Sequence, residues 1–265
     1  MKRIESRDNA AFKGFKKLCQ SARERRKTGR IVLEGMHLIE SFAARFGLPD
    51  EVVVSQTGLQ TNEIARYLDQ VAGQASAVLL ADGLFAELSE LDHPSGIIAF
   101  AAWPAVAKPV DDCCDTVVLD GVQDPGNLGS ILRSAAAAGF KQAVLSDDCA
   151  QAWSPKVLRA GMGAHFLIDI FESVDLAPFL DRFQGQSIVT ALDGKRSLFE
   201  VPLREPVAWV FGSEGQGVRL EVAACVRERV LIPMPGQTES LNVGAAAAVC
   251  LFETVRQRLP EKSRD

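Results

Sequence analysis

Two polar loops near the C-terminal end of the sequence carry groups that could bind a small molecule and act on it. They read Val210-Phe-Gly-Ser-Glu-Gly-Gln-Gly-Val218 and Ile232-Pro-Met-Pro-Gly-Gln-Thr-Glu-Ser-Leu-Asn-Val-Gly244. Each follows an apolar run, and such loops at the carboxyl edge of a sheet expose the backbone groups with which α/β proteins hold ligands. Ser240 and Asn242 precede an uncharged segment, and packing gives no reason for both. Helix capping is the ordinary alternative for Ser240.

A third segment combines a turn with a polar helix start. It runs from Leu119 to Gly139, contains Asp124-Pro-Gly126, and places Asn127 at the expected N-cap of an alanine-rich helix. Arg133 is the only charged residue between Asp124 and Lys141, so we expect an arginine inside a helix that is buried nearly all round. A buried guanidinium needs an anionic partner, which either a protein carboxylate or a ligand phosphate supplies. Asn127 and Arg133 differ in direction by about 120° around the helix and could border one cleft.

Several common kinds of site are excluded by spacing. The loop at Gly212, Gly215 and Gly217 lacks the GK[ST] ending of a P-loop and does not match the Rossmann fingerprint, which disfavours a nicotinamide dehydrogenase. An adenosyl ligand held by backbone groups remains open. The three histidines and six cysteines show no metal-ligand spacing, so no metal site is expected. The cysteines are interpreted as reduced thiols of a cytoplasmic protein.

The elements around these loops alternate between strand and helix, which predicts an α/β fold with a mostly parallel sheet. Residues 1–101 form a smaller α/β unit, 102–112 a linker with two prolines, and 113–265 the larger domain; an extended edge strand is the alternative for the linker. Predicted strands lie at 31–33, 51–55, 77–80, 96–101, 116–119, 142–145, 166–171, 187–191, 207–211 and 229–232. Predicted helices lie at 8–27, 35–46, 63–71, 127–138, 155–161, 176–183, 220–226 and 241–258.

The charge distribution is uneven along the chain. Residues 1–30 carry eleven Lys and Arg against three Asp and Glu, a net charge of +8, whereas the whole chain has a net charge of -5. A basic arm on an acidic body favours a polyanionic partner such as nucleic acid, although a solvated helix face is the plain alternative. The residues expected to contact such a nucleic acid are Lys13, Lys16, Lys17, Arg23, Arg25, Arg26, Lys27 and Arg30.

Together, the three segments resemble the SpoU (TrmH) family of RNA 2′-O-ribose methyltransferases in the SPOUT superfamily. The first family motif resembles Asn127-x-Gly-x-x-x-Arg133, the second Gly212-x-Glu-x-x-Gly217, and the third Ile232-Pro-Met-x-Gly-x-x-x-Ser-Leu-Asn242. Gly244 stands where the family commonly has serine. The resemblance covers about Asp115 to Leu259. The N-terminal part is similar to the L30e-type substrate-binding domain that is often attached to these enzymes.

This resemblance implies a fold, a cofactor and roles for the residues. It implies S-adenosylmethionine as methyl donor, a C-terminal trefoil knot and a homodimer. The implied catalytic residues are Asn127, Arg133, Glu214, Ser240 and Asn242, and the implied cofactor-binding residues are Thr190, Gly212, Ile232, Met234 and Leu241. A guanidinium is a poor proton acceptor, so we expect Arg133 to hold a phosphate and stabilise the alkoxide.

The target implied by the basic arm and the L30e-like domain is structured RNA, with 23S ribosomal RNA favoured. Transfer RNA is the alternative substrate. A non-catalytic RNA-binding factor for ribosome assembly is the alternative function, and the complete set of motif residues argues against it.

Overall fold

The structure is a computed structural model that describes residues 1–104 and 108–260. The chain forms two compact units, which are described separately. The first consists of Met1–Ala105 together with Trp153–Phe166, and the second of Val106–Ala152 together with Leu167–Asp265.

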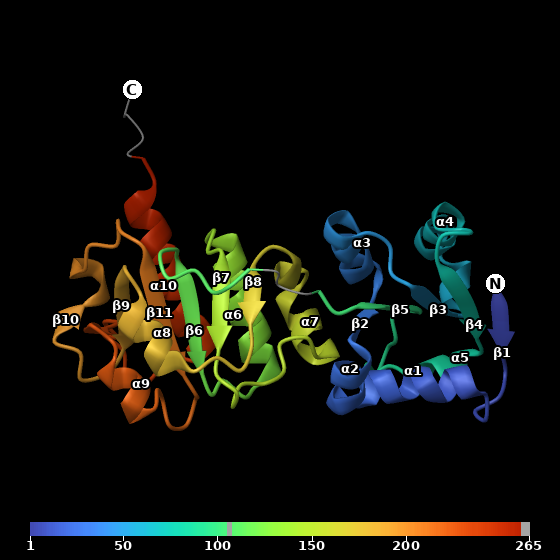
Figure 1. Cartoon of the computed structure of the whole chain (residues 1–265), viewed down its shortest axis with the longest axis horizontal. Coiled ribbons are helices and arrows are strands. Elements are labelled where there is room, and N and C mark those ends of the chain that lie inside the picture. The colour runs from blue at the N-terminus through green and yellow to red at the C-terminus, as the bar shows by residue number, and fades with distance from the viewer. Residues whose placement is uncertain (105–107, 261–265) are drawn as a thin grey trace. The chain divides into compact units, whose positions relative to one another are not determined.

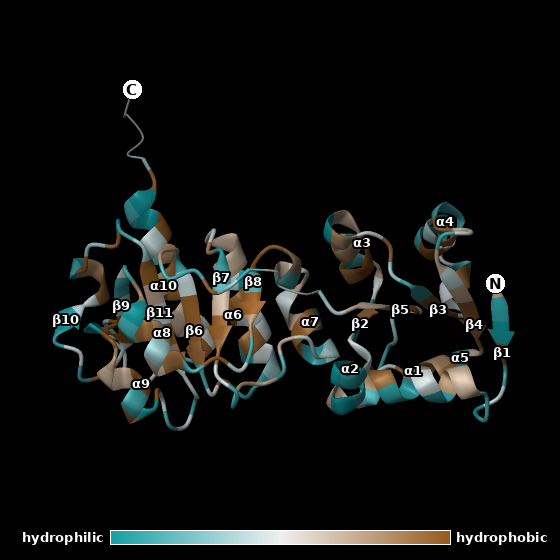
Figure 2. Ribbon diagram, in the orientation of Figure 1, coloured by the Kyte–Doolittle hydropathy of each residue, from teal (hydrophilic) through white to brown (hydrophobic). Residues whose placement is uncertain are grey.

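The first unit is built on a five-stranded sheet in the order β1-β4-β3-β5-β2 (Figure 1). β1 and β3 run parallel to β4, whereas β5 is antiparallel to both β3 and β2. The strands are β1 (Lys2–Ile4), β2 (Arg30–Glu34), β3 (Glu51–Ser55), β4 (Ser76–Leu80) and β5 (Ile97–Ala102). β3 and β5 are buried along most of their length, whereas the edge strand β1 is hydrophilic in Figure 2.

The helices of this unit are α1 (Ala10–Gln20), α2 (Ala22–Thr28), α3 (Met36–Phe46), α4 (Asn62–Gln70), α5 (Asp82–Ala86) and α7 (Pro155–Gly161), with 3-10 turns η1 (Gly58–Gln60) and η2 (Ala164–Phe166). α1 packs its aromatic face on the sheet, where the rings of Phe15 and Phe100 stack at 5.0 Å. The single helix predicted over 8–27 is wrong. Ser21 has an extended backbone, and its hydroxyl accepts a hydrogen bond from Glu24 N at 3.3 Å, so a second helix starts there.

The second unit contains a seven-stranded sheet in the order β10-β12-β9-β11-β6-β7-β8, in which every neighbouring pair is parallel. The strands are β6 (Thr116–Asp120), β7 (Gln142–Leu145), β8 (Asp169–Phe171), β9 (Gln186–Thr190), β10 (Arg196–Ser197), β11 (Val207–Gly212) and β12 (Glu228–Leu231). β6, β7 and most of β11 are buried, as the apolar runs of the sequence predict for parallel strands covered on both faces.

Helices cover both faces of this sheet. They are α6 (Pro125–Ala137), α8 (Leu176–Arg182), α9 (Leu220–Ala224) and α10 (Val243–Arg258), with the 3-10 turn η3 (Leu198–Glu200). α8 and α9 share an apolar core with Val118 and Val210. Trp209 points to the other face, where its indole N–H donates to Thr254 Oγ1 of α10 at 3.0 Å, and α10 packs beside α6.

The predicted α/β class with a mostly parallel sheet is confirmed, with a separate smaller unit at the N-terminus. The strand predicted at 166–171 is shorter, because η2 precedes β8. Trp153–Phe166 belongs to the first unit, since α7 packs on β2 and Phe166 packs edge-on against Phe42. The predicted boundaries 1–101, 102–112 and 113–265 stay a prediction: Ala102 ends β5, and residues 105–107 and 261–265 lie outside the described residues.

None of the helices in the described parts of the chain combines the length and apolar character needed to cross a bilayer.

Candidate active site

A cavity of about 660 Å³ lies where β9, β11 and β12 end. The carboxyl ends of parallel strands form the usual ligand edge of an open α/β sheet. All five residues predicted to bind the cofactor line this cavity, and so do three of the five predicted catalytic residues. These are Thr190, Gly212, Ile232, Met234 and Leu241, together with Glu214, Ser240 and Asn242. Eight of the ten predicted catalytic and cofactor-binding residues therefore lie on the wall of one cavity.

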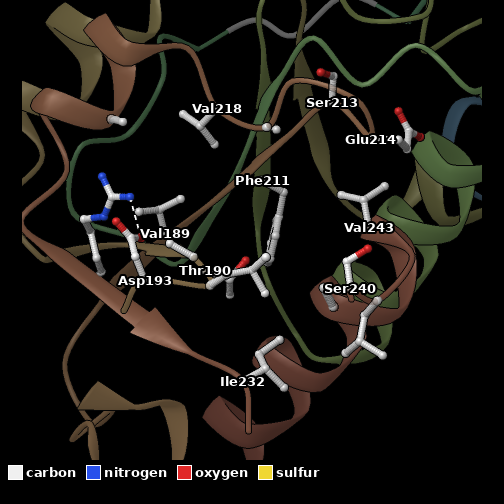
Figure 3. A pocket seen from close by; sticks show the side chains of 18 of the residues that line it. Val189, Thr190, Asp193, Phe211, Ser213, Glu214, Val218, Ile232, Ser240 and Val243 are labelled. Carbon is white, nitrogen blue, oxygen red and sulfur yellow. Dashed lines mark hydrogen bonds and ion pairs between the residues drawn. The ribbon is translucent and has the colours of Figure 1, made fainter. Parts of the chain in front are cut away.

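The middle of the cavity is apolar and its two ends are polar. Val189, Phe211, Val218, Ile232 and Val243 surround the middle (Figure 3). Glu214 and Ser240 lie on one side of the view and Asp193 on the other. An aromatic base fits the middle, and polar substituents would meet the ends, so the lining suits an adenosyl ligand with a charged tail.

Gly212 ends β11 at a point where backbone segments approach very closely. A Cβ atom placed there would lie 2.1 Å from the carbonyl carbon of Gly217. The loop closes on itself, because Ser213 and Gly217 exchange backbone hydrogen bonds of 3.1 and 2.9 Å. Gly217 has φ +69°, a conformation that favours glycine. The glycines of this loop therefore shape a tight turn that carries Glu214.

A buried carboxylate fixes the far end of the same loop. Asp120, at the end of β6, is 1% exposed and accepts hydrogen bonds from both N and Nε of Arg219, each at 2.8 Å. Arg219 follows the loop directly and precedes α9. The hydrogen bonds tie the loop to the neighbouring strand and hold its two ends in place.

The N-cap of α6 is Asp124, whose carboxylate accepts a hydrogen bond from Asn127 N at 2.7 Å. The predicted N-cap role of Asn127 is therefore wrong. The helix begins two residues earlier than predicted, because Pro125 suits its first turn. As a result, the Asn127 side chain is available for other contacts.

Three predicted catalytic side chains form one chain of hydrogen bonds. Asn242 is the N-cap of α10, and its Oδ1 accepts from Gly244 N at 2.9 Å and Ala245 N at 3.3 Å. Its Nδ2 must then face outward, and it donates to Asn127 Oδ1 at 2.9 Å. Asn127 Nδ2 in turn donates to Glu214 Oε1. The helix start thus sets the orientation of both amides and, through them, of the Glu214 carboxylate.

Ser240 is not the cap of this helix, since Asn242 takes that position. Its hydroxyl forms no hydrogen bond with the described residues and lies on the cavity wall (Figure 3). Gly244 is buried, and a Cβ atom there would lie 3.1 Å from Asn242 Oδ1. A small residue at this position leaves room for the amide network.

The expectation that Arg133 is buried is wrong. Arg133 is exposed and forms no ion pair with another described residue. Gly126, Ser130, Arg133 and Ala137 make an exposed stripe along α6, while Leu128, Ile131 and Leu132 on the other side are buried. The alanine-rich composition of this helix therefore does not indicate that all of its faces are buried. The exposed guanidinium of Arg133 can bind an anion from outside the protein.

The predicted RNA-binding residues divide into three groups. Lys13, Lys17, Arg23, Arg26 and Lys27 are exposed on α1 and α2, and α2 is almost entirely hydrophilic in Figure 2. Lys13 pairs with Asp8, and the half-buried Lys16 pairs with Glu87.

Arg25 and Arg30 are corrections to this set. Arg25 is 4% exposed and donates to Leu18 O and Cys19 O at the end of α1, so it stabilises the helix end and has no surface for RNA. Arg30 is half-buried over the ring of Phe100 and lies 3.7 Å from two carboxylates of β3 and its preceding turn. Basic composition does not distinguish these structural arginines from exposed ones.

Sequence reasoning missed four charged residues of the site: Asp120, Asp193, Arg219 and Arg229. Asp193 and Arg229 line the cavity and form an ion pair of 2.8 Å. The hydrogen bond from Arg229 lowers the pKa of Asp193. The partners are 36 and 99 positions apart, so no local motif links them. The one signal in the sequence was the position of Asp120, an acidic residue directly after the strand predicted at 116–119.

Comparisons with known proteins show the family of this chain. Residues 116–252 match the family model described as SpoU rRNA Methylase family, and residues 9–99 match the MRM3-like substrate binding domain. The chain is 32% identical over 259 residues to the 23S rRNA (guanosine(2553)-2′-O)-methyltransferase RlmP of Bacillus subtilis, covering 95% of this chain and 98% of that protein. It is 35% identical over 173 residues to the 23S rRNA (guanosine-2′-O-)-methyltransferase RlmB of Bordetella pertussis, covering 62% of this chain and 71% of that protein.

Two solved structures have a similar fold. The SpoU methyltransferase AviRb from Streptomyces viridochromogenes, in complex with the cofactor AdoMet, has a TM-score of 0.84 and 26% identity, covering 94% of this chain and 98% of that one. A crystal structure of an RNA 2′-O ribose methyltransferase has a TM-score of 0.82 and 29% identity, covering 97% of this chain and 99% of that one.

Proposed function

Because the chain belongs to the SpoU rRNA methylase family, we propose that it methylates a ribose 2′-oxygen of 23S ribosomal RNA. It is an RNA 2′-O-methyltransferase, and its cofactor is S-adenosylmethionine. The choice of 23S RNA follows the names of its relatives and the substrate-binding match of residues 9–99.

The observation that carries this proposal is the position of the amide network at the rim of the adenosyl-shaped cavity. Asn242 and Glu214 belong to both, since each lines the cavity and takes part in the hydrogen-bond chain through Asn127. S-adenosylmethionine, when bound, supplies a methyl group activated by its sulfonium. The chain must then orient a ribose hydroxyl toward that end of the cavity and stabilise the negative charge that develops on its oxygen.

Besides the two asparagines of the hydrogen-bond chain, the other three predicted catalytic residues each have a role in this proposal. Ser240 has a hydroxyl on the cavity wall that can bond to the ribose. Glu214 keeps one carboxylate oxygen on Asn127 and has the other for the hydroxyl proton. The exposed Arg133 binds the adjacent RNA phosphate and stabilises the alkoxide, because a guanidinium keeps its charge and can bind phosphate with two hydrogen bonds.

The proposed cofactor contacts use backbone as much as side chains. Gly212 lets the loop close over the edge of the sheet, and Thr190, Ile232, Met234 and Leu241 provide the surrounding surface. Such a pocket recognises shape and base edges without a phosphate cradle, in agreement with the missing P-loop.

The exposed face of α1 and α2 provides a further RNA contact in this proposal. Lys17, Arg23, Arg26 and Lys27 offer charges for phosphate contacts that position RNA without reading its sequence. Replacing Lys17 and Arg26 by glutamine should lower the slope of log affinity against log salt by about two. The matched control is Arg3→Gln, since Arg3 of β1 pairs with Glu5 directly after the strand. An unchanged slope in the double variant would remove this face from the proposal.

We further propose a homodimer formed through α10. Phe252 on α10 and Leu259 directly after it are 48% and 63% exposed, and the exposed Ala245 lies on the same side of the helix as Phe252. Exposed apolar stripes of this kind are covered in oligomers. Phe252→Glu should convert a dimer to a monomer in sedimentation analysis, and a wild-type monomer would contradict the proposal.

Two further features are proposed from the family resemblance and from the cysteines. A trefoil knot in the C-terminal domain follows from family resemblance. A cytoplasmic location agrees with six free cysteines and a ribosomal substrate.

The function is tested by mapping 2′-O-methyl groups in total RNA from cells with and without the gene. One site in 23S RNA should disappear and return with the wild-type gene. It should stay absent with Arg133→Ala, while purified Arg133→Ala still binds S-adenosylmethionine. Arg133→Lys should restore little turnover, because lysine cannot make the two-bonded phosphate contact. Loss of a transfer RNA site, or no lost site, would contradict the proposal.

A further inference from the structure

We propose that the Asp193–Arg229 ion pair binds the amino-acid end of S-adenosylmethionine, with Arg229 on the carboxylate and Asp193 on the ammonium. This inference rests on the proposed function and adds two residues that no family motif contains. Both residues line the cavity, and they join through Arg229 Nη2 and Asp193 Oδ1 at 2.8 Å.

Charge is distributed unevenly within the cavity. Its charged lining residues are Asp193, Glu214 and Arg229. Glu214 is committed to Asn127 on the side of the cavity where Ser240 lies, whereas Asp193 lies on the opposite side of the view in Figure 3. One end of the cavity therefore presents a positive and a negative group side by side. Apart from the sulfonium, the charges of the cofactor are one carboxylate and one ammonium on adjacent positions of its tail.

The sulfonium of S-adenosylmethionine carries three substituents, which are the methyl group, the adenosyl group and the amino-acid tail. The methyl group must face the Ser240 and Asn242 end for transfer to a ribose. The adenosine fits the apolar middle formed by Phe211 and Ile232, among others. The remaining substituent is the amino-acid tail, and the charged end of the cavity is the part that would complement it.

The backbone holds the Asp193–Arg229 pair in place before any ligand binds. Asp193 lies in a turn held to β12, since Ala191 N donates to Val230 O at 2.9 Å and Gly194 N to Ala191 O at 3.1 Å. A Cβ atom at Gly194 would lie 2.6 Å from the carbonyl carbon of Val230, so the turn rests directly on the strand. Arg229 is part of β12. Both charges are thus mounted on rigid backbone at a fixed separation.

Stability does not explain the pair. The side chains are 50% and 75% exposed, and ion pairs this open contribute little to folding. Their attraction for a ligand rises once the ligand excludes water from the cavity. Hydrogen bonding from Arg229 also keeps Asp193 ionised, because it lowers the pKa of that carboxyl.

Calorimetric binding of three ligands tests the assignment. They are S-adenosylmethionine, its decarboxylated form, and 5′-methylthioadenosine, which lacks the whole amino-acid end. Arg229→Gln should weaken S-adenosylmethionine about tenfold or more, as expected for losing a hydrogen bond to a charged group, and leave the other two within about twofold. Asp193→Asn should weaken S-adenosylmethionine and its decarboxylated form but spare 5′-methylthioadenosine.

Arg196→Gln is the matched control. Arg196 pairs with Glu228 at 3.0 Å across the neighbouring strands β10 and β12 and does not line the cavity. It should bind all three ligands like the wild type. Equal weakening of 5′-methylthioadenosine by Asp193→Asn would assign Asp193 to the ribose and overturn the inference, as would unchanged binding in both variants. A wild type that binds no S-adenosylmethionine would instead refute the proposed function.

Discussion

Replacing Asn242 by aspartate separates the two functions of this side chain. The Oδ1 atom caps α10, and the Nδ2 atom donates to Asn127. Aspartate keeps an oxygen for the cap and removes the only donor. Asn127 then faces an oxygen where it had an N–H, so its amide should turn over and present its own oxygen to Glu214. The orientation of that carboxylate is lost without any change in the fold.

The expected magnitudes differ between stability and turnover. Aspartate caps helices as well as asparagine does, so Asn242→Asp should unfold within about 0.5 kcal/mol of the wild type. Asn242→Ala should lose about 1 kcal/mol for the cap and about 1 kcal/mol for the hydrogen bond to Asn127. Turnover should fall about tenfold to a hundredfold in both variants, equivalent to roughly 1.4 to 2.8 kcal/mol of barrier.

Urea denaturation and single-turnover transfer of a labelled methyl group to RNA measure these quantities. Cofactor affinity by calorimetry shows whether the cavity itself has changed. We expect Asn242→Asp to be as stable as the wild type but slow in methyl transfer. Asn242→Ala should be both less stable than the wild type and slow in methyl transfer. If Asn242→Asp turns over within about twofold of the wild type, the network does not orient Glu214. Activity that follows stability across the two variants would also refute it.

Three other predictions address the loop, its anchor and α10. Gly212→Ala should keep the fold and weaken cofactor affinity at least about tenfold by calorimetry, since the loop must open; Gly215→Ala, with open space at its Cβ, is the control and should bind normally. Asp120→Asn should lower urea stability by about 1–3 kcal/mol, because a buried carboxylate holds a guanidinium, and an unchanged midpoint would count against that anchor. Hydrogen bonding from Arg256 lowers the pKa of Glu253, so this carboxylate stabilises the fold above its unfolded pKa of about 4.3 and ceases to do so as pH falls through its folded pKa. The stability difference between Glu253→Gln and wild type should therefore shrink as pH falls from 7 through this folded pKa.

The sequence predicted the larger unit well because its strands are long apolar runs. Val207–Gly212 and Thr116–Asp120 are buried on both faces, and a parallel sheet with helices on both sides accommodates such runs. β1 and the two-residue β10 were not predicted, since Lys2 to Ile4 and Arg196 to Ser197 carry no apolar periodicity.

The residues of the candidate site could be predicted from the sequence, whereas the hydrogen bonds that join them could not. Gly212 and Asn242 stood out by type and spacing, whereas the hydrogen bonds that join Asn127 to Glu214 span 87 positions. Arg25 and Arg133 were misjudged in opposite directions. One is buried by tertiary packing against α1, and the other is exposed on a helix whose composition suggested burial. Burial of a charged residue depends on contacts that local sequence does not contain.

The amide network also fixes when the enzyme can become active during its own synthesis. Its members enter the growing chain in the order Asn127, Glu214, Asn242, and 115 positions separate the first from the last. At translation rates of about 5–20 residues per second, Asn127 waits roughly 6–23 s for the donor that orients it. Until Asn242 is added, Asn127 lacks this donor, and Glu214, which follows Asn127 by 87 positions, is not yet held by the complete network. A nascent chain whose central strands are already paired is therefore still without catalytic capacity, and translation must pass α10 before the first methyl group can be transferred.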